Sequence, residues 1–440
     1  MKTLLKNVAI VPMDGSHKTF ADSYLEITDS KISGLWQASE FADLSRQQNW
    51  DKVIDGTGKC VMPGLVNGHT HTPMALLRGY GEGCNLHDWL FSKIFPAEEK
   101  LNAESVYHGA MLAIAEMLLN GITCFADQYF FCEAIAKAVL DSGIRANISR
   151  GLQCFDQDFS SPKDDYRLRE GESLYRDYHD ANDGQIKIWV GPHSVYTCVP
   201  RYLQAAIELA GKLGTGMHIH LSETADEVEK CIAVYGATPF QHCKSLGFFD
   251  SVPVLAAHCV HLSEDDFAVI ANAKDIRIVH NPGSNLKLAS GIAPLKKILN
   301  QKTQICLGTD GVASNNDADI LKEIRLAATL AKVREHDPLA VGPWDILEMA
   351  TRRGCASLGF DNAGTIRVGG LADLIVLDIS RPNMYPLHDL ITNIVYSSNA
   401  SNVAHVFVNG VMLVEDGELT QIDLPRLLTN AQKLAERLTN

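Results

Sequence analysis

The stretch GLVNGHTH, residues 64–71, is a short apolar run that ends in two histidines separated by one threonine. Alternate residues of a β-strand point to the same side, so His69 and His71 would present both imidazoles together at the end of such a strand. The spacing alone leaves two interpretations open, half of a metal site or the polar end of a buried strand. The rest of the chain decides between them.

Seven further apolar runs follow this one, and stretches with apolar residues at helical spacing lie between them. The strand candidates are GLVNGHTH (64–71), GITCFADQ (121–128), IRANISRGL (144–152), IKIWVGPHS (186–194), GMHIHLSE (216–223), VPVLAAHCV (252–260), IRIVHNP (276–282) and TQICLGTDG (303–311). Such alternation is typical of an α/β fold, and eight strands over roughly 300 residues match the size of a TIM barrel. We therefore predict a (β/α)8 TIM barrel as the catalytic domain over residues 63–360.

The two ends of the chain have a different pattern, with short β-like runs broken by Gly, Asp and Ser. The N-terminal runs predict a small antiparallel sheet. Near the other end, Asn409-Gly410 stands between apolar runs and predicts a hairpin, and the sequence EDGE at 415–418 predicts a final turn. Because chain termini often lie close together, we expect residues 1–62 and 361–440 to form one small β-sandwich domain.

Polar side chains stand at the carboxyl ends of nearly all the predicted strands. They are His69, His71, Arg150, His193, His220, His258, Asn281 and Asp310. Active sites of TIM barrels lie at this face of the barrel. The polar residues at the strand ends therefore predict an active site at this face. Histidines scattered at random along the chain would not all stand at strand ends.

A metal centre is the most specific prediction from these strand ends. A second His-x-His pair, His218 and His220, precedes Glu223, and Asp310 ends an apolar strand where an unpaired charge would be costly. Three imidazoles and one carboxylate suit Zn²⁺ or a similar metal such as Fe²⁺. We expect one divalent metal ion per subunit, zinc first and iron as the alternative.

Composition excludes several other classes of function. The formal net charge of −14 argues against nucleic acid or an anionic membrane as a partner. No apolar window approaches the ~18 residues of a membrane span, and the N-terminus lacks a signal-peptide core. The 11 cysteines never form C-x-x-C, which is typical of reduced thiols. We expect a cytoplasmic homo-oligomer that acts on a small molecule.

The chain resembles the amidohydrolase superfamily, in its cytosine-deaminase and chlorohydrolase-like branch. The strings that carry the resemblance are PGLVNGHTH (63–71), HIHLSE (218–223), AAHCVHL (256–262), HNPGSNLKLASG (280–291) and LGTDGVASNN (307–316). A further string, RGYGEGCNLHDWLFSKIFPAEEKL (78–101), resembles the 5-methylthioadenosine/S-adenosylhomocysteine deaminases in particular. The resemblance covers nearly the whole chain.

The resemblance implies a role for each of the central residues. The implied metal ligands are His69, His71, His220 and Asp310, and the implied catalytic residues are Glu223, His258 and Asp310. Asp310 would accept a proton as hydroxide attacks the amine-bearing carbon, Glu223 would protonate the neighbouring ring nitrogen, and His258 would hydrogen-bond the hydroxide or the tetrahedral intermediate. His218 is left as a polar neighbour that does not bind the metal.

Substrate-binding residues are implied in the same way. Glu98 matches a carboxylate that binds ribose hydroxyls, Arg150 and His193 match substrate-contacting positions, and Glu223 contacts the base. Arg167 matches an arginine that grips the carboxylate of S-adenosylhomocysteine, with Arg169 as the rival.

The implied activity is hydrolytic deamination of the 6-amino group of an adenine nucleoside, namely 5′-methylthioadenosine, S-adenosylhomocysteine or adenosine, with release of ammonia. Two alternatives lie within the superfamily: a deaminase of guanine or another aminopurine, and a triazine chlorohydrolase. A third alternative is a metal-dependent binding protein without catalysis. The retained Glu223 and His258 favour an enzyme.

Overall fold

The computed structural model describes residues 1–44, 49–84, 86–301 and 303–439. Its larger part is a sheet of eight parallel strands in which neighbours in sequence are neighbours in space. The strands are β6 (Leu65–Thr70), β7 (Ile122–Tyr129), β8 (Arg145–Leu152), β9 (Ile186–Pro192), β10 (Met217–Leu221), β11 (Val254–His258), β12 (Ile276–His280) and β13 (Gln304–Leu307). Seven of them lie inside the predicted runs, and β7 extends one residue past its run, to Tyr129. The predicted TIM barrel is therefore confirmed.

Hydrogen bonds from the residues that follow the last strand bring the two edges of this sheet together. The backbone N–H of Asp310 donates to the carbonyl of His69 at 2.8 Å, and the N–H of Thr309 donates to Oδ1 of Asn67 at 2.9 Å. The ends of β6 and β13 are therefore held together at the same edge of the barrel, where the sequence places its candidate ligands.

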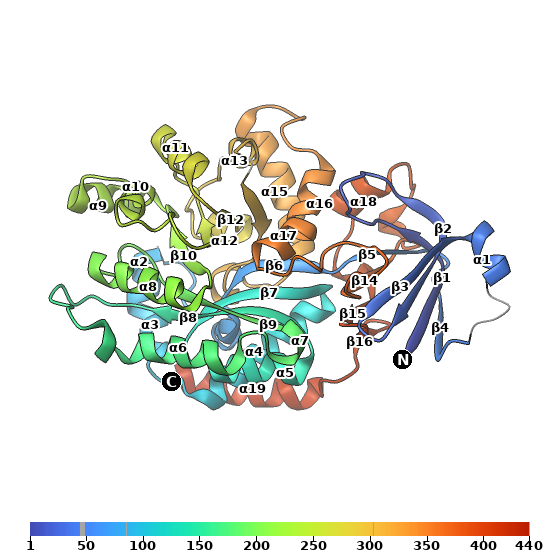
Figure 1. The fold of residues 1–440 in the computed structure, drawn as a ribbon, viewed down its shortest axis with the longest axis horizontal. Helices are drawn as coiled ribbons and strands as arrows, with labels where there is room; N and C mark the ends of the chain where they lie inside the picture. Colours follow the sequence, from blue (N-terminus) through green and yellow to red (C-terminus); the bar gives the residue numbers. More distant parts are fainter. Residues whose placement is uncertain (45–48, 85, 302, 440) are drawn as a thin grey trace.

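Helices cover the outside of the barrel (Figure 1). The longer ones are α4 (Ala103–Leu119), α5 (Cys132–Ser142), α6 (Tyr166–Tyr178), α8 (Pro200–Leu213), α9 (Ala225–Tyr235), α10 (Pro239–Ser245), α11 (Glu264–Asn272), α15 (Ile320–Glu335) and α16 (Pro343–Ala350). Shorter ones are α2 (Leu86–Trp89), α3 (Phe95–Glu98), α7 (Ala181–Gly184), α12 (Pro282–Lys287), α13 (Leu295–Leu299), α14 (Val312–Asn315) and α17 (Arg352–Ser357). Side-chain caps fix several of the starts; Thr224, for example, accepts the N–H of Glu227 at the start of α9.

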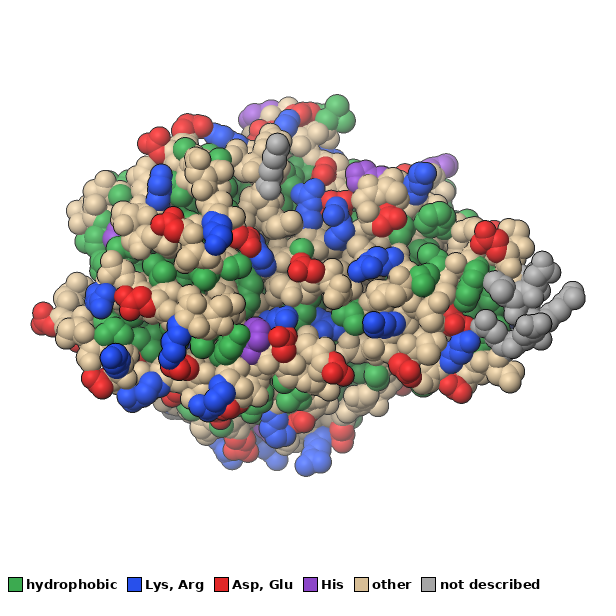
Figure 2. All heavy atoms as spheres, viewed as in Figure 1, with side chains coloured by type: hydrophobic (Ala, Val, Ile, Leu, Met, Phe, Trp, Pro, Cys, Tyr) green, Lys and Arg blue, Asp and Glu red, His purple; other side chains and the backbone are tan. Residues whose placement is uncertain are grey.

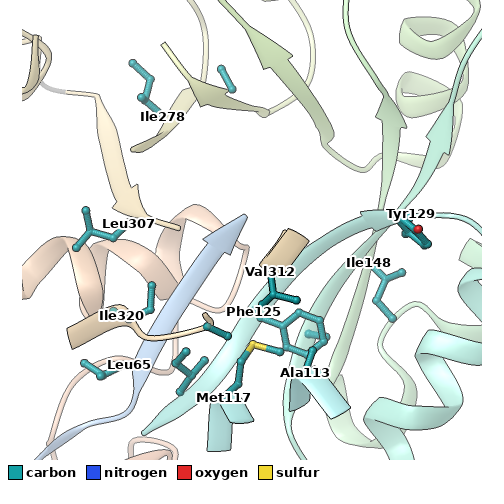
Figure 3. Close-up of a cluster of buried hydrophobic side chains, with 14 of the residues drawn as sticks. Leu65, Ala113, Met117, Phe125, Tyr129, Ile148, Ile278, Leu307, Val312 and Ile320 are labelled. Atoms are coloured by element: carbon teal, nitrogen blue, oxygen red, sulfur yellow. The ribbon is translucent and has the colours of Figure 1, made fainter. Parts of the chain in front are cut away.

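The main core lies between the barrel strands and these helices. Every residue of β7 and β8 is buried, as expected for parallel strands that are covered on both sides. Figure 3 shows part of this core, with Phe125 of β7 beside Met117 and Ala113 of α4. The core is apolar, so the polar residues at the carboxyl ends of the strands form a separate layer next to it.

A second sheet of nine strands is built from both ends of the chain. Its strands are β1 (Lys2–Ile10), β2 (Phe20–Thr28), β3 (Lys31–Gln37), β4 (Lys52–Asp55), β5 (Lys59–Pro63), β14 (Leu374–Asp378), β15 (Val403–Val408), β16 (Val411–Glu415) and β17 (Glu418–Leu419), with α1 (Ala38–Leu44) after β3 and α18 (Leu390–Tyr396) before β15. The antiparallel pair β5–β14 joins the two ends, so both ends of the chain build one small sheet, as predicted; the bounds 1–62 and 361–440 stay a prediction.

The prediction of an antiparallel N-terminal sheet was wrong in part, because β1 pairs parallel with both β4 and β5. The chain passes through two further strands before it returns, and this long connection permits a parallel pairing. The hairpin at Asn409-Gly410 is confirmed: both residues have positive φ, and β15 pairs antiparallel with β16.

The C-terminal helix α19 (Leu424–Thr439) leaves the second sheet and packs against α4 of the barrel. In Figure 1 it runs below the barrel, away from the N-terminus. Its buried residues Leu427, Ala431, Leu434 and Leu438 repeat at helical spacing. Among the described residues no helix is both long and apolar enough to cross a membrane, and acidic and basic side chains are interspersed over the face shown in Figure 2.

Candidate metal centre and active site

The predicted ligands come together at the carboxyl end of the barrel. Nε2 of His69 and Nε2 of His71 lie 3.4 Å and 3.3 Å from Oδ1 of Asp310. Nε2 of His220 lies 3.3 Å from Nε2 of His71. Residues about 240 positions apart in the sequence are thus neighbours because β6, β10 and β13 end at the same face.

The other ring nitrogen of each of these histidines is already engaged. Nδ1 of His71 lies 2.7 Å from the carbonyl oxygen of Gln128, and Nδ1 of His220 lies 2.7 Å from that of His193. A carbonyl accepts a hydrogen bond only from a protonated nitrogen, so each Nδ1 donates, and in the neutral imidazole Nε2 then keeps a lone pair for the shared centre. Nδ1 of His69 is engaged by a histidine, His218, at 2.8 Å.

The donor set fits a divalent metal ion. Nε2 of His69 is buried and has no hydrogen-bond partner among the described residues, and the donor atoms of His69, His71 and Asp310 all lie within 4.8 Å of one another. Ligands at about 2.0–2.2 Å in a tetrahedral site stand about 3.3–3.6 Å apart, which agrees with the distances above. His258 belongs to a second group with His69 and His220 within the same limit.

Asp310 is held in place on both carboxylate oxygens. Oδ2 accepts hydrogen bonds from the hydroxyls of Ser284 at 2.6 Å and Ser314 at 2.9 Å. Oδ1 accepts the N–H of Gly311 at 2.7 Å and faces the histidines. Burial acts to raise the pKa of Asp310, but His69 and His71 hold it well below its usual range. The carboxylate is therefore ionised and its Oδ1 is directed at the centre.

Glu223 and His258 face each other beside this centre, with Oε2 and Nε2 3.8 Å apart. Ser290 donates its hydroxyl to Oε1 of Glu223 at 3.2 Å, and Nδ1 of His258 lies 2.8 Å from Oδ1 of Asn285. Burial raises the pKa of Glu223. A carboxyl group with a raised pKa at this position is suited to take up and deliver a proton.

Glu227, in the first turn of α9, fixes the backbone on which Glu223 stands. Its carboxylate accepts the N–H of Ser222 at 3.1 Å and that of Glu223 at 2.7 Å. Ser222 has φ +52°, a conformation that costs energy for a residue other than glycine. The buried carboxylate therefore stabilises a strained turn directly after β10.

Three cavities with shared lining residues surround the centre. The metal-side cavity, of about 60 Å³, is lined among others by His71, Glu98, His193, Glu223 and Asp310. The β7–β8 cavity, of about 610 Å³, is lined among others by Phe130, Arg150, Gln153, Tyr166 and Glu170. The β9–β10 cavity, of about 930 Å³, is lined among others by Val195, Val199, Thr224, Ala225 and Lys230. The metal-side cavity is too small for a nucleoside alone, so a substrate of that size extends into a neighbouring cavity.

Glu98 lies where the metal-side cavity meets the β7–β8 cavity, since it lines both. The hydroxyl of Tyr129 donates to its Oε1 at 2.5 Å. Burial raises the pKa of Glu98 to about 7. A carboxylate at this junction is placed to accept hydrogen bonds from a polar group that leaves the metal-side cavity.

The arginines predicted to bind substrate differ in their surroundings. Arg150 lines the β7–β8 cavity and pairs with Glu170 at 2.8 Å. Arg167 pairs with Asp165 and also donates to the carbonyl of Gln153. Arg169 donates to the carbonyl of Lys163 at 3.4 Å, near the surface. Arg150 is thus the one of the three that borders a described cavity.

Comparisons with known proteins identify the family of this chain. The sequence profile of the amidohydrolase family matches residues 60–413. The chain belongs to the amidohydrolase family. It is 41% identical to a protein of Thermoanaerobacter pseudethanolicus named 5-methylthioadenosine/S-adenosylhomocysteine deaminase, over 100% of this chain and 99% of the relative. A protein of Dictyoglomus thermophilum with the same name is 44% identical over 91% of this chain and 92% of its own length.

A solved structure of similar fold is a zinc-bound adenosine deaminase from Xanthomonas campestris. It superposes with a TM-score of 0.92 at 32% identity, over 99% of this chain and 98% of that one. The family membership inferred from the sequence motifs is therefore confirmed over nearly the full length.

The sequence did not predict the residues that hydrogen-bond the candidate ligands and the acid–base residues or their backbone. They are His218, Glu227, Ser284, Asn285, Ser290 and Ser314. Ser284, Asn285 and Ser290 all lie in the string HNPGSNLKLASG. The string was noted as a family resemblance, but nothing in its spacing shows which carboxylate or imidazole each side chain meets.

Proposed function

We propose that this amidohydrolase is a metal-dependent hydrolytic deaminase that converts the 6-amino group of an adenine nucleoside to an oxo group and releases ammonia. The observation that carries the proposal is similarity over the whole chain to proteins named 5-methylthioadenosine/S-adenosylhomocysteine deaminase. The ligand set of three imidazoles and Asp310, with Glu223 beside it, supplies the chemistry that such a reaction needs.

His69, His71, His220 and Asp310 are proposed to hold one divalent metal ion, zinc in preference to iron. Three neutral imidazoles and one carboxylate are the borderline donors that zinc takes, and the solved relative carries zinc. A metal ion bound there would supply Lewis-acid activation of a water molecule.

The chain's own residues move the protons. Asp310, held ionised, accepts a proton from the attacking water and later returns it to the amino group, which leaves as ammonia while the hydroxyl that added to the ring gives its proton back to Glu223. Glu223 delivers a proton to the ring nitrogen next to the amine-bearing carbon; burial raises its pKa, which favours the protonated form that this step needs. Nε2 of His258 lies 3.8 Å from Glu223 and hydrogen-bonds the oxygen that adds to the ring.

On the substrate side, Glu98 is proposed to bind the ribose hydroxyls and His193 to contact the base. The group on the 5′ carbon then extends past Glu98 into the β7–β8 cavity, which Arg150 borders. Arg167 remains a proposed partner of a substrate carboxylate, with Arg169 as the rival. Its ion pair with Asp165 must open for that contact.

A substrate panel tests the proposal. The zinc-loaded enzyme is assayed for ammonia release from 5′-methylthioadenosine, S-adenosylhomocysteine, adenosine and guanine, and for chloride release from a chlorotriazine. The expected result is turnover of at least one adenine nucleoside and none of the chlorotriazine. Turnover of guanine alone would overturn the substrate proposal while leaving the metal site in place.

Location and assembly follow more general arguments. All 11 cysteines are free, which supports a reducing compartment such as the cytoplasm. Association into a homo-oligomer stays a prediction.

A further inference from the structure

The β9–β10 cavity adjoins the metal-side cavity, but no part of the proposed substrate occupies it. Tyr196 and Leu288 line both this cavity and the metal-side cavity, so they form the boundary between the two. The β7–β8 cavity lies on the other side of Phe91 and Phe155, which line both larger cavities. A substrate held at the metal centre is therefore next to two separate spaces.

The order of the barrel strands tells which part of a substrate faces which space. Around the barrel the sequence is β10, β9, β8 and β7. Glu223 follows β10, His193 follows β9, and Glu98 binds Tyr129 at the end of β7. In adenine the ring order from the amine-bearing carbon is N1, C2, N3, C4 and then N9, which carries the ribose.

The order of the strands around the barrel can be matched to the order of the atoms around the adenine ring. This match rests on the proposed function. With N1 at Glu223 and the ribose at Glu98, the edge of the base between them faces β9. C2, which lies directly after N1, is then placed between Glu223 and His193. The segments that follow these two residues, Val195–Val199 and Thr224–Lys230, contribute lining residues of the β9–β10 cavity.

We propose that the β9–β10 cavity is a specificity subsite that receives an apolar substituent on C2 of the adenine ring. The enzyme would then deaminate 2-substituted adenine nucleosides as well as the unsubstituted ones. The 5′ group has its own space in the β7–β8 cavity, so both substituents fit at the same time.

The lining of the cavity supports an apolar occupant. Its side chains include Leu90, Val195, Cys198, Val199, Cys231 and Leu288. The charged groups of α9 that line the cavity are engaged with each other or with the backbone: Lys230 pairs with Asp226 at 2.7 Å, and Glu227 accepts two backbone N–H groups. About 930 Å³ leaves ample room for a phenyl ring.

The test compares 5′-methylthioadenosine with its 2-phenyl derivative as substrates of the zinc-loaded enzyme. The expected result is that kcat/KM for the derivative stays within about tenfold of that for the parent compound, because the phenyl ring enters an existing apolar space and meets no steric clash. A derivative that is neither deaminated nor inhibitory, while the parent is turned over, would overturn the subsite. Failure of both compounds, and of every other adenine nucleoside, would overturn the proposed function itself.

A matched pair of variants on α9 locates the phenyl group. Ala225 lines the cavity, whereas Ala233 does not line it, and both are exposed. Ala225→Phe is expected to lower the ratio of kcat/KM for the derivative to that for the parent by about tenfold or more, as the new ring occupies the space. Ala233→Phe is expected to leave this ratio unchanged.

The outcomes that contradict the subsite are specific. An equal ratio in the two variants would show that the phenyl group lies elsewhere. If Ala225→Phe instead selectively impairs 5′-phenylthioadenosine, the cavity holds the 5′ group and the assignment to C2 is wrong.

Discussion

His69 and His218 lie 2.8 Å apart, Nδ1 to Nε2, across the interior of the barrel, and neither side chain is exposed to solvent. The two His-x-His pairs of the sequence thus differ in what they do. His69 and His71 both direct Nε2 at the shared centre, whereas in the second pair only His220 does so. His218 stands behind His69 and engages its other ring nitrogen.

Replacing His218 by Phe should weaken metal binding without removing a ligand. The ring keeps its volume but no longer accepts from Nδ1 of His69, so the orientation of that ligand and its tautomer are no longer fixed. Loss of such a partner typically costs about 10–100-fold in metal affinity. Zinc affinity is measured by competition with a chelator. His242→Phe, at a buried histidine on α10, is the control, and an unchanged affinity in His218→Phe would contradict the role.

The candidate ligands could be picked out from the sequence because they stand at the ends of apolar runs, as His71 and Asp310 do, and the family resemblance then chose His220 over His218. Local pattern thus gives the barrel and the identity of the groups at its mouth. The supports could not be predicted in this way. Ser284 meets Asp310 and Asn285 meets His258 through contacts between different strand ends, and a single sequence holds no signal for such pairs.

Glu223→Gln should abolish turnover and keep the metal. The amide has nearly the same shape but cannot exchange a proton, and a positioned acid–base group contributes about 10²–10⁴-fold. The measurements are kcat with 5′-methylthioadenosine and zinc content of the purified protein. Glu229→Gln, at an exposed position in the same segment, should behave as wild type. Near wild-type turnover in Glu223→Gln would exclude the proposed proton transfer.

The hydroxyls of Ser284 and Ser314 should act as a unit on Asp310. Both donate to Oδ2 and lie 3.3 Å from each other. Each Ser→Ala change is expected to reduce zinc affinity, and the double variant to lose less than the sum, since neighbouring residues couple by about 0.5–3 kcal/mol. A double-variant cycle on zinc affinity measures this coupling. Strict additivity would show that the two hydroxyls act independently.

The pH dependence of stability should contain a contribution from Glu323. Burial raises its pKa to about 8, although Asn315 and the N–H of Gly283 donate hydrogen bonds to it. The folded state therefore keeps a proton that the unfolded chain loses above its ordinary pKa of 4.5. The stabilisation from this group is complete below that value and is lost as the pH rises through about 8.

Glu323→Gln should remove this slope, because glutamine does not titrate. Melting temperatures are compared at about pH 5 and about pH 8.5, and the variant should gain relative to wild type at the higher pH. Glu335→Gln, exposed at the end of the same helix, is the control and should show the wild-type slope. An identical slope in Glu323→Gln and wild type would refute the assignment.

A buried ion pair joins the barrel to the second sheet. Nε of Arg145, on β8, donates to Oδ2 of Asp373 at 2.7 Å, and Asp373 also accepts the N–H of Asn409 at 2.7 Å. Removal of one partner leaves the other charge buried and uncompensated, which costs about 3–5 kcal/mol. Asp373→Asn should therefore lower the midpoint of urea unfolding strongly.

Two further variants distinguish the free-energy cost of losing the ion pair from the cost of leaving one buried charge without a partner. The double variant Arg145→Met with Asp373→Leu removes both charges, so it should be more stable than Asp373→Asn alone. Lys137→Ala removes one partner of the exposed pair Lys137–Asp141 on α5, and it should leave the free energy of unfolding almost unchanged. A midpoint of Asp373→Asn equal to that of Lys137→Ala would show that the buried pair does not hold the two parts of the chain together.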